Sequence, residues 1–140
     1  MVKQISVFLE NSRGKLAHIT ETLGQAGVDL YSLSIADTAS FGILRIVVND
    51  TDRALKVLRD EGYAVNVADL IAIAVPDAPG GLAHALRPLS DAGVGVEYLY
   101  SYVRKSSQSA LILFKSDNVT QAVAVLEGAG IPLLGQDELA

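Results

Sequence analysis

The stretch Ser12-Arg13-Gly14-Lys15-Leu16-Ala17-His18 recurs 66 residues later as Ala78-Pro79-Gly80-Gly81-Leu82-Ala83-His84. When residues 11–37 are compared with 77–103, nine of the 27 positions are identical, whereas unrelated segments would share about two. A displacement of 68 aligns the later part of each copy. Because the repeat is long and occurs twice, we interpret the chain as two duplicated domains, residues 1–68 and 69–140, and not as a solenoid.

Each copy contains the same order of local patterns. Alternating apolar residues predict a strand over Ile5–Leu9, and apolar residues at helical spacing then predict a helix that ends at Gly27. Two strands joined by a turn follow, then a helix that begins at Asp50-Thr51-Asp52 and a strand from Tyr63. The two middle strands cover Val28–Asp37 and Ile43–Asn49, with the turn at Ser40–Gly42. In the second copy the elements are Leu70–Val75, Gly80–Ala92, Val94–Val103, Ala110–Lys115, Val119–Ala129 and Ile131–Leu134.

The order β-α-β-β-α-β predicts an α+β fold of two ferredoxin-like units. Right-handed crossovers place both helices of a unit on one face of a four-stranded antiparallel sheet. The junction between the copies, at Ala68-Asp69, lies within an eleven-residue stretch that has no Pro, Gly or Ser, so we expect one strand to run directly into the next. Pro88 falls inside the predicted helix Gly80–Ala92, and we interpret it as the site of a bend.

Composition and charge exclude several classes of protein. The chain has 140 residues, no Cys, two His and a formal charge of −5. A cysteine-based metal site or nucleophile is therefore absent, and the acidic balance argues against a nucleic-acid partner. No apolar run approaches the ~20 residues of a membrane helix, and the N-terminus has no secretory pattern. We expect a cytoplasmic protein with no membrane partner.

The sequence contains no recognisable catalytic arrangement. We find no serine triad, phosphate-binding loop or dinucleotide-binding motif. His18 and His84 occupy the same repeat position and face away from the predicted apolar stripe. They could form a metal pair or act in acid–base chemistry, but we favour solvent-facing residues that were copied by duplication. We therefore expect no enzymatic activity, no cofactor and no metal.

The turn between the first strand and first helix of each copy is the better candidate for binding. It combines a polar residue at the strand end, Asn11 or Asp77, with a glycine at the helix entry, Gly14 or Gly80. Free N–H groups at a helix N-terminus bind a carboxylate well, and a nearby Asp or Asn can hold an ammonium group. These are the two polar halves of an α-amino acid. The alternative is that both glycines serve only the turn.

Two motifs resemble the ACT domain. Copy two contains Asp77-x-Pro79-Gly80-x-Leu82 followed by Ala92-Gly93-Val94, and copy one contains Asn11-x-Arg13-Gly14-x-Leu16 followed by Ala26-Gly27-Val28. The whole chain resembles stand-alone tandem ACT proteins. That resemblance implies a non-catalytic regulatory protein that binds a small molecule, most often an amino acid, at interfaces between paired domains.

The same resemblance implies a set of ligand-binding residues. In copy one these are Asn11, Gly14 and Asp29, and in copy two they are Asp77, Gly80 and Gly95. Copy one has Arg13 where proline is usual, and Gly95 of copy two offers no side chain, so one or two working sites per chain remain open. The competing functions are a structural oligomerisation module and a ligand-free regulatory subunit of a metabolic, amino-acid biosynthetic enzyme.

A row of tyrosines, Tyr98, Tyr100 and Tyr102, should line the sheet face opposite the helices, together with Leu111 and Leu113. Such a row could stack nucleic-acid bases. The acidic charge and aliphatic neighbours instead favour a packed interface within the chain or between chains, because large apolar faces are rarely left wet. We expect a homodimer as the smallest stable species.

Overall fold

The computed structural model describes residues 1–10, 12–37, 41–102 and 109–139, which form two compact units. One comprises Lys3–Ala68 and the other Asp69–Ala140 together with Met1–Val2. We call them the N-terminal unit and the C-terminal unit. Each contains the predicted β-α-β-β-α-β order, so the α+β architecture with two ferredoxin-like units is confirmed.

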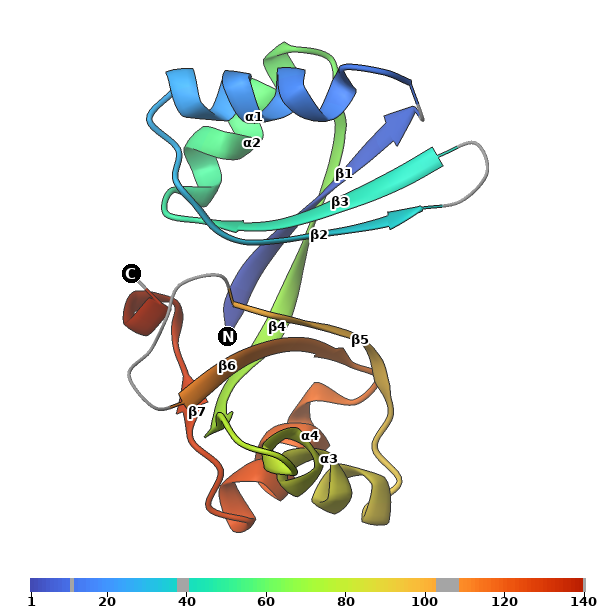
Figure 1. Ribbon diagram of the computed structural model, residues 1–140, viewed down its shortest axis with the longest axis vertical. Coiled ribbons are helices and arrows are strands. Elements are labelled where there is room, and N and C mark those ends of the chain that lie inside the picture. Colours follow the sequence, from blue (N-terminus) through green and yellow to red (C-terminus); the bar gives the residue numbers. More distant parts are fainter. Residues whose placement is uncertain (11, 38–40, 103–108, 140) are drawn as a thin grey trace. The chain divides into compact units, whose positions relative to one another are not determined.

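In the N-terminal unit, helices α1 and α2 cover one face of an antiparallel sheet (Figure 1). The strand order is β2-β3-β1-β4, with Ile5 opposite Ile46 and Glu10 opposite Phe41 in the register of β1 and β3. The elements are β1 (Val2–Glu10), α1 (Lys15–Gln25), β2 (Leu30–Asp37), β3 (Phe41–Val48), α2 (Thr51–Asp60) and the first part of β4 (Ala64–Pro76).

The C-terminal unit repeats this topology. Strands β6 and β7 pair with the two edges of β4, and β5 pairs with β6, which gives the order β7-β4-β6-β5. The elements are the second part of β4, α3 (Gly81–Asp91), β5 (Val96–Ser101), β6 (Ser109–Ser116), α4 (Val119–Gly128), β7 (Leu133–Leu134) and the 3-10 helix η1 (Gln136–Leu139).

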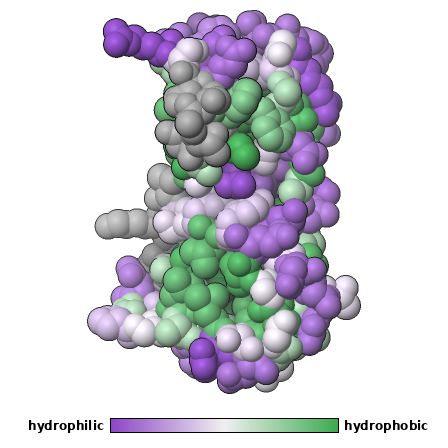
Figure 2. Space-filling model, turned by 90° about the vertical axis from the view of Figure 1, so that its right-hand side faces the viewer, coloured by the Kyte–Doolittle hydropathy of each residue, from purple (hydrophilic) through white to green (hydrophobic). Residues whose placement is uncertain are grey.

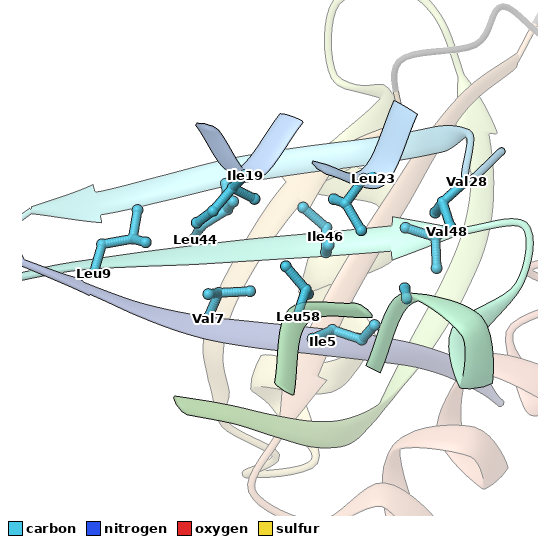
Figure 3. Close-up of a cluster of buried hydrophobic side chains, with 11 residues drawn as sticks. Ile5, Val7, Leu9, Ile19, Leu23, Val28, Leu44, Ile46, Val48 and Leu58 are labelled. Carbon is cyan, nitrogen blue, oxygen red and sulfur yellow. The ribbon is translucent and has the colours of Figure 1, made fainter. Parts of the chain in front are cut away.

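Each unit has its own hydrophobic core between the helices and the sheet. In the N-terminal unit, alternate residues of β1 meet Ile19 and Leu23 of α1 and Leu58 of α2 (Figure 3). The spacing of these residues follows the strand period of two and the helical period of 3.6, which turns one side of each element inward. The C-terminal core has equivalent members, including Ile73, Leu89, Phe114 and Leu126.

Three details depart from the sequence analysis or qualify it. Helix α3 continues through Pro88 to Asp91, so the helix is confirmed in spite of the internal proline. Strand β7 covers only Leu133–Leu134 and not Ile131–Leu134, because Pro132 has no N–H for a ladder bond. The predicted turn at Ser40–Gly42 is wrong at two of its residues, because Phe41 and Gly42 belong to β3 and pair with Glu10 and Leu9 of β1. Ser40 and the predicted strand end at Val103 lie outside the described residues.

The predicted junction between the copies lies inside a strand. β4 is continuous over 13 residues, and its first part belongs to the N-terminal unit and its second part to the C-terminal unit. The absence of Pro, Gly and Ser from residues 65–75 explains this, since nothing in that stretch ends a strand.

Candidate functional site

The first helix of each unit begins without a side-chain cap. The residue before α1 is Gly14 and the residue before α3 is Gly80, and both adopt left-handed conformations with φ of 87° and 83°. The second helices differ, because the side chains of Asp50 and Asn118 accept hydrogen bonds from the first turns of α2 and α4. The Lys15 and Gly81 N–H groups donate to the Ser12 and Ala78 carbonyls, so the N–H groups that follow them in α1 and α3 are the ones left for a bound anion.

The predicted binding residues of copy one do not all meet within the N-terminal unit. Gly14 precedes α1, whereas Asp29 follows its C-terminal end. An 11-residue helix is about 16 Å long, so these two residues are separated by roughly that distance. Asn11 lies outside the described residues.

The predicted residues of copy two divide in the same way. Asp77 follows the end of β4 and lies three residues before Gly80, and both are exposed. Gly95 lies beyond the other end of α3. The predicted binding residues of each unit therefore fall into two groups, one at each end of its first helix.

A carboxylate that the sequence analysis missed lies beside Gly95. Asp117 Oδ1 accepts a hydrogen bond from the Gly95 backbone N–H, and a Cβ at Gly95 would lie 2.5 Å from Asp117 Oδ2. The corresponding pair in the N-terminal unit is Asp29 and Asn49, in which Asn49 Oδ1 accepts from the Asp29 N–H. The displacement of 68 that aligns Asn49 with Asp117 was the signal that could have revealed this carboxylate.

A hollow of about 630 Å³ opens at the end of the N-terminal sheet, next to the Gly14 turn. It is bordered by the end of β1, the start of α1, the start of β3 and the segment between α2 and β4. Its lining combines aromatic and charged side chains: Phe8, Glu10, Arg13, Lys15, His18, Phe41, Glu61 and Tyr63, with Leu9, Gly14, Gly62 and Ala64 between them.

The polar centre of this hollow is a chain of three side chains. His18 Nδ1 lies 2.6 Å from the Tyr63 hydroxyl, and His18 Nε2 lies 3.7 Å from a carboxylate oxygen of Glu61. Burial, together with the negative charge of Glu61, raises the pKa of Tyr63 above its ordinary value of 10.0. Tyr63 therefore stays a neutral phenol at neutral pH. His18 is half exposed, as predicted, but it also has this partner 45 residues away in the sequence.

The tyrosine row occupies the expected sheet face. In the register of β5 and β6, Tyr100 lies opposite Leu113, which is fully buried, while Leu99 lies opposite the core residue Phe114. Tyr102 is buried, and its hydroxyl donates a hydrogen bond to the Leu139 carbonyl. At Tyr102 the face is therefore covered and not open for stacking bases.

Two classes of feature are not found in the described part of the chain. Within residues 1–10, 12–37, 41–102 and 109–139, no three His, Asp or Glu side chains are grouped as a metal ion requires. Among the same residues, none of the helices has the length and apolar character needed to cross a membrane.

Comparison with known proteins identifies relatives over the full chain. A family model described as an ACT domain pair matches residues 1–140. The crystal structure of protein BT0572 from Bacteroides thetaiotaomicron is similar, with 40% identity and a TM-score of 0.92, over 99% of this chain and 94% of that one. No curated protein matches the chain.

More distant structures share the fold. The ligand-free regulatory subunit of aspartate kinase from Thermus thermophilus has 15% identity and a TM-score of 0.64, over 91% of this chain and 92% of that one. The corresponding regulatory subunit from Thermus flavus has 14% identity and a TM-score of 0.62, over 91% and 92% of the two chains.

Proposed function

Because this chain belongs to the family described as an ACT domain pair, we propose that it is a non-catalytic regulatory protein that binds an amino acid. We place its action in the cytoplasm. The observation that supports this most directly is the contrast between helices. Both second helices are capped by side chains, whereas α1 and α3 begin at left-handed glycines and have no side-chain cap. The remaining N–H groups of their first turns suit the carboxylate of an amino acid.

The proposed ligand is held at both of its charged ends. Its carboxylate accepts hydrogen bonds from N–H groups after Gly14 or Gly80, and its ammonium group lies beside the strand-end residue Asn11 or Asp77. The ammonium group also contacts a carboxylate from the other kind of half-site, such as Asp29 in copy one. At Gly95 of copy two the neighbouring Asp117 supplies that carboxylate.

This arrangement requires two ACT units to be paired. The turn glycine and the residue beyond the helix lie about 16 Å apart in one unit, because α1 has 11 residues. A single small amino acid cannot reach both. A complete site therefore takes its turn from one copy of the chain and the carboxylate of its other half-site from a second copy.

The exposed apolar residues support assembly into a homodimer. Leu33 and Ile35 of the edge strand β2 are 43% and 49% exposed, and Leu16 of α1 is exposed as well. Figure 2 shows that hydrophobic residues also gather on part of the surface of the C-terminal unit. Edge strands with apolar side chains are usually covered by a partner. Light scattering at micromolar concentration should give the mass of a dimer, and a monomer mass would contradict this proposal.

A thermal-shift screen against the twenty amino acids tests the function. A ligand at 100 times its Kd stabilises the folded state by about 2.7 kcal/mol, which raises the melting temperature by several degrees. A chain that acts only as an oligomerisation module, or as a regulatory subunit without its own ligand, would show no shift with any amino acid. Calorimetry on the strongest hit then gives the number of sites per chain.

A further inference from the structure

The fold produces the hollow at the sheet end twice. The C-terminal unit has a matching hollow of about 390 Å³, lined by Ala74, Val75, Pro76, His84, Ser109, Gly130, Ile131 and Pro132. The displacements of 66 and 68 relate each of these residues to one that lines the larger hollow of the N-terminal unit. The two hollows are thus the same place in two copies of one fold.

The side chains that line the two copies are chemically different. Phe8, Glu10, Phe41 and Tyr63 of the N-terminal hollow are replaced by Ala74, Pro76, Ser109 and Ile131. The histidine, His18 or His84, and the glycine, Gly62 or Gly130, are the same in both. The C-terminal unit folds with the same topology without the aromatic and acidic residues. Folding therefore does not explain why the N-terminal hollow has them.

The charged groups of the N-terminal hollow are of both signs and balance each other. Glu10 and Glu61 are acidic, and Arg13 and Lys15 are basic. In the part of the chain that the structure describes, neither Arg13 nor Lys15 is in an ion pair. Their repeat equivalents are Pro79 and Gly81, and the equivalent of Glu61 is Ala129, so the C-terminal hollow has no such charges.

The aromatic residues of the hollow leave a large apolar surface in contact with water. Phe41 is 58% exposed and Phe8 is 47% exposed. Glu10 lies opposite Phe41 and Phe8 opposite Ile43 in the register of β1 and β3, so the two rings are diagonal neighbours on one sheet face. A flat apolar group that covered them would gain both hydrophobic contact and ring–ring contact.

We propose that the N-terminal hollow is a binding site for a zwitterionic small molecule with an aromatic body, of the type of a free aromatic amino acid. The ring of the ligand packs against Phe8 and Phe41, its carboxylate pairs with Arg13 and Lys15, and its ammonium group pairs with Glu10 and Glu61. The volume is within the usual range for a small-molecule site.

The hydrogen-bonded pair of His18 and Tyr63 gives this site a fixed polar wall. The distance of 2.6 Å between the Tyr63 hydroxyl and His18 Nδ1 restrains both side chains, and the other ring nitrogen faces Glu61. This restraint holds the Glu61 carboxylate near the hollow. Tyr63 and His18 are positioning residues in this site, while the charged and phenylalanine side chains make the contacts.

This site goes beyond the function proposed above and does not depend on it. The half-sites at the helix ends need two paired units, whereas every residue that lines the hollow belongs to the N-terminal unit. The hollow borders Gly14, but its binding side chains differ from Asn11, Asp29 and Asp77. Variants can therefore separate the two sites.

The test is calorimetry of the full chain with three probes. These are L-phenylalanine, 3-phenylpropanoate, which lacks the ammonium group, and 2-phenylethylamine, which lacks the carboxylate. We expect L-phenylalanine to bind, and each truncated probe to bind at least about tenfold more weakly, because each loses the charge-assisted contacts of one charged end. Equal affinity for all three probes would overturn the assignment of the charged groups.

Variants locate the bound probe. Phe41→Ala and Arg13→Gln should each weaken L-phenylalanine binding by about tenfold or more, and Tyr63→Phe should weaken it less. His84→Ala, at the matching position of the C-terminal hollow, is the control and should leave the affinity unchanged. Because Phe41, Arg13 and His84 are exposed, these three variants should keep the melting temperature of the ligand-free protein.

Two outcomes would overturn the proposal. One is that the wild-type chain binds none of L-phenylalanine, L-tyrosine and L-tryptophan. The other is that L-phenylalanine binds but only Asp29→Ala or Asp77→Ala weakens it, which would place it at the helix-end site. That second outcome would refute the hollow as a binding site but would leave the proposed regulatory function intact. If the chain binds a non-aromatic amino acid and no aromatic one, the hollow is likewise refuted and the regulatory function is likewise unaffected.

Discussion

Asp117 Oδ1 accepts a hydrogen bond from the backbone N–H of Gly95 at 2.9 Å. In the N-terminal unit the same bond, also 2.9 Å, joins Asn49 Oδ1 to the N–H of Asp29. A second bond runs the other way in each unit, from the N–H of Asn49 to the carbonyl of Asp29 and from the N–H of Asp117 to the carbonyl of Gly95. The two copies thus share one hydrogen-bond pattern, and each has one carboxylate in the pair. In copy one the carboxylate belongs to Asp29, just before β2, and in copy two it belongs to Asp117, just after β6.

Exchanging these residues should restore the arrangement of copy one in copy two. We expect Gly95→Asp alone to lower stability, because its side chain would meet the Asp117 carboxylate. The double variant Gly95→Asp with Asp117→Asn should recover most of the loss. Urea unfolding of the two single variants and the double variant should give a coupling of about 0.5–3 kcal/mol. Additive effects would show that the two positions are independent.

Two glycines should respond to alanine in opposite directions. A Cβ at Gly81 would lie 1.9 Å from the backbone oxygen of Pro76, so Gly81→Ala must displace the turn and should lower the unfolding free energy by about 1–3 kcal/mol. Gly24 lies inside α1 with nothing within 4 Å of its Cβ position. Gly24→Ala should raise the unfolding free energy by about 0.5–1 kcal/mol. Chemical denaturation measures both, and a stabilising Gly81→Ala would contradict the close approach.

The proposed half-sites can be separated by substitution. Asp29→Ala tests copy one and Asp77→Ala tests copy two. Each removes a charge-assisted hydrogen bond of about 1.5–3 kcal/mol, so each should weaken amino-acid binding by roughly ten- to a hundredfold if its copy binds. Both residues are exposed, so neither change should unfold the protein. Calorimetry of each variant would show which copy binds. An unchanged affinity in both variants would place the amino acid elsewhere.

Tyr63 should make stability depend on alkaline pH. Its pKa in the folded protein is raised by burial and by the Glu61 charge, so the folded state holds the phenol proton more tightly than the unfolded chain. That contribution is fully present below the ordinary pKa of 10.0 and is lost as the pH rises through the folded value. Tyr63→Phe should therefore lose less stability above pH 10 than the wild type does. Parallel curves of unfolding free energy against pH would contradict this.

Local patterns and the duplication were sufficient to predict the fold. Strand alternation around Val7, helical spacing around Leu23 and the glycines at both helix ends are short-range signals, and each occurs twice. The candidate site depended on contacts that are distant in the sequence. Tyr63 meets His18 across 45 residues, and Asp117 meets Gly95 across 22. No local pattern predicts such contacts, although comparing the two copies position by position points to the residues that changed.

The continuity of β4 bears on how the protein could be taken apart. Proteases cut most readily at exposed loop tips, and domain pairs joined by such loops can be released as fragments. Here the boundary at Ala68 and Asp69 lies inside a strand, so a cut there would leave each half with a truncated strand at its boundary. Limited digestion should therefore not yield two intact halves. A chain truncated at this boundary would end in the same incomplete strand.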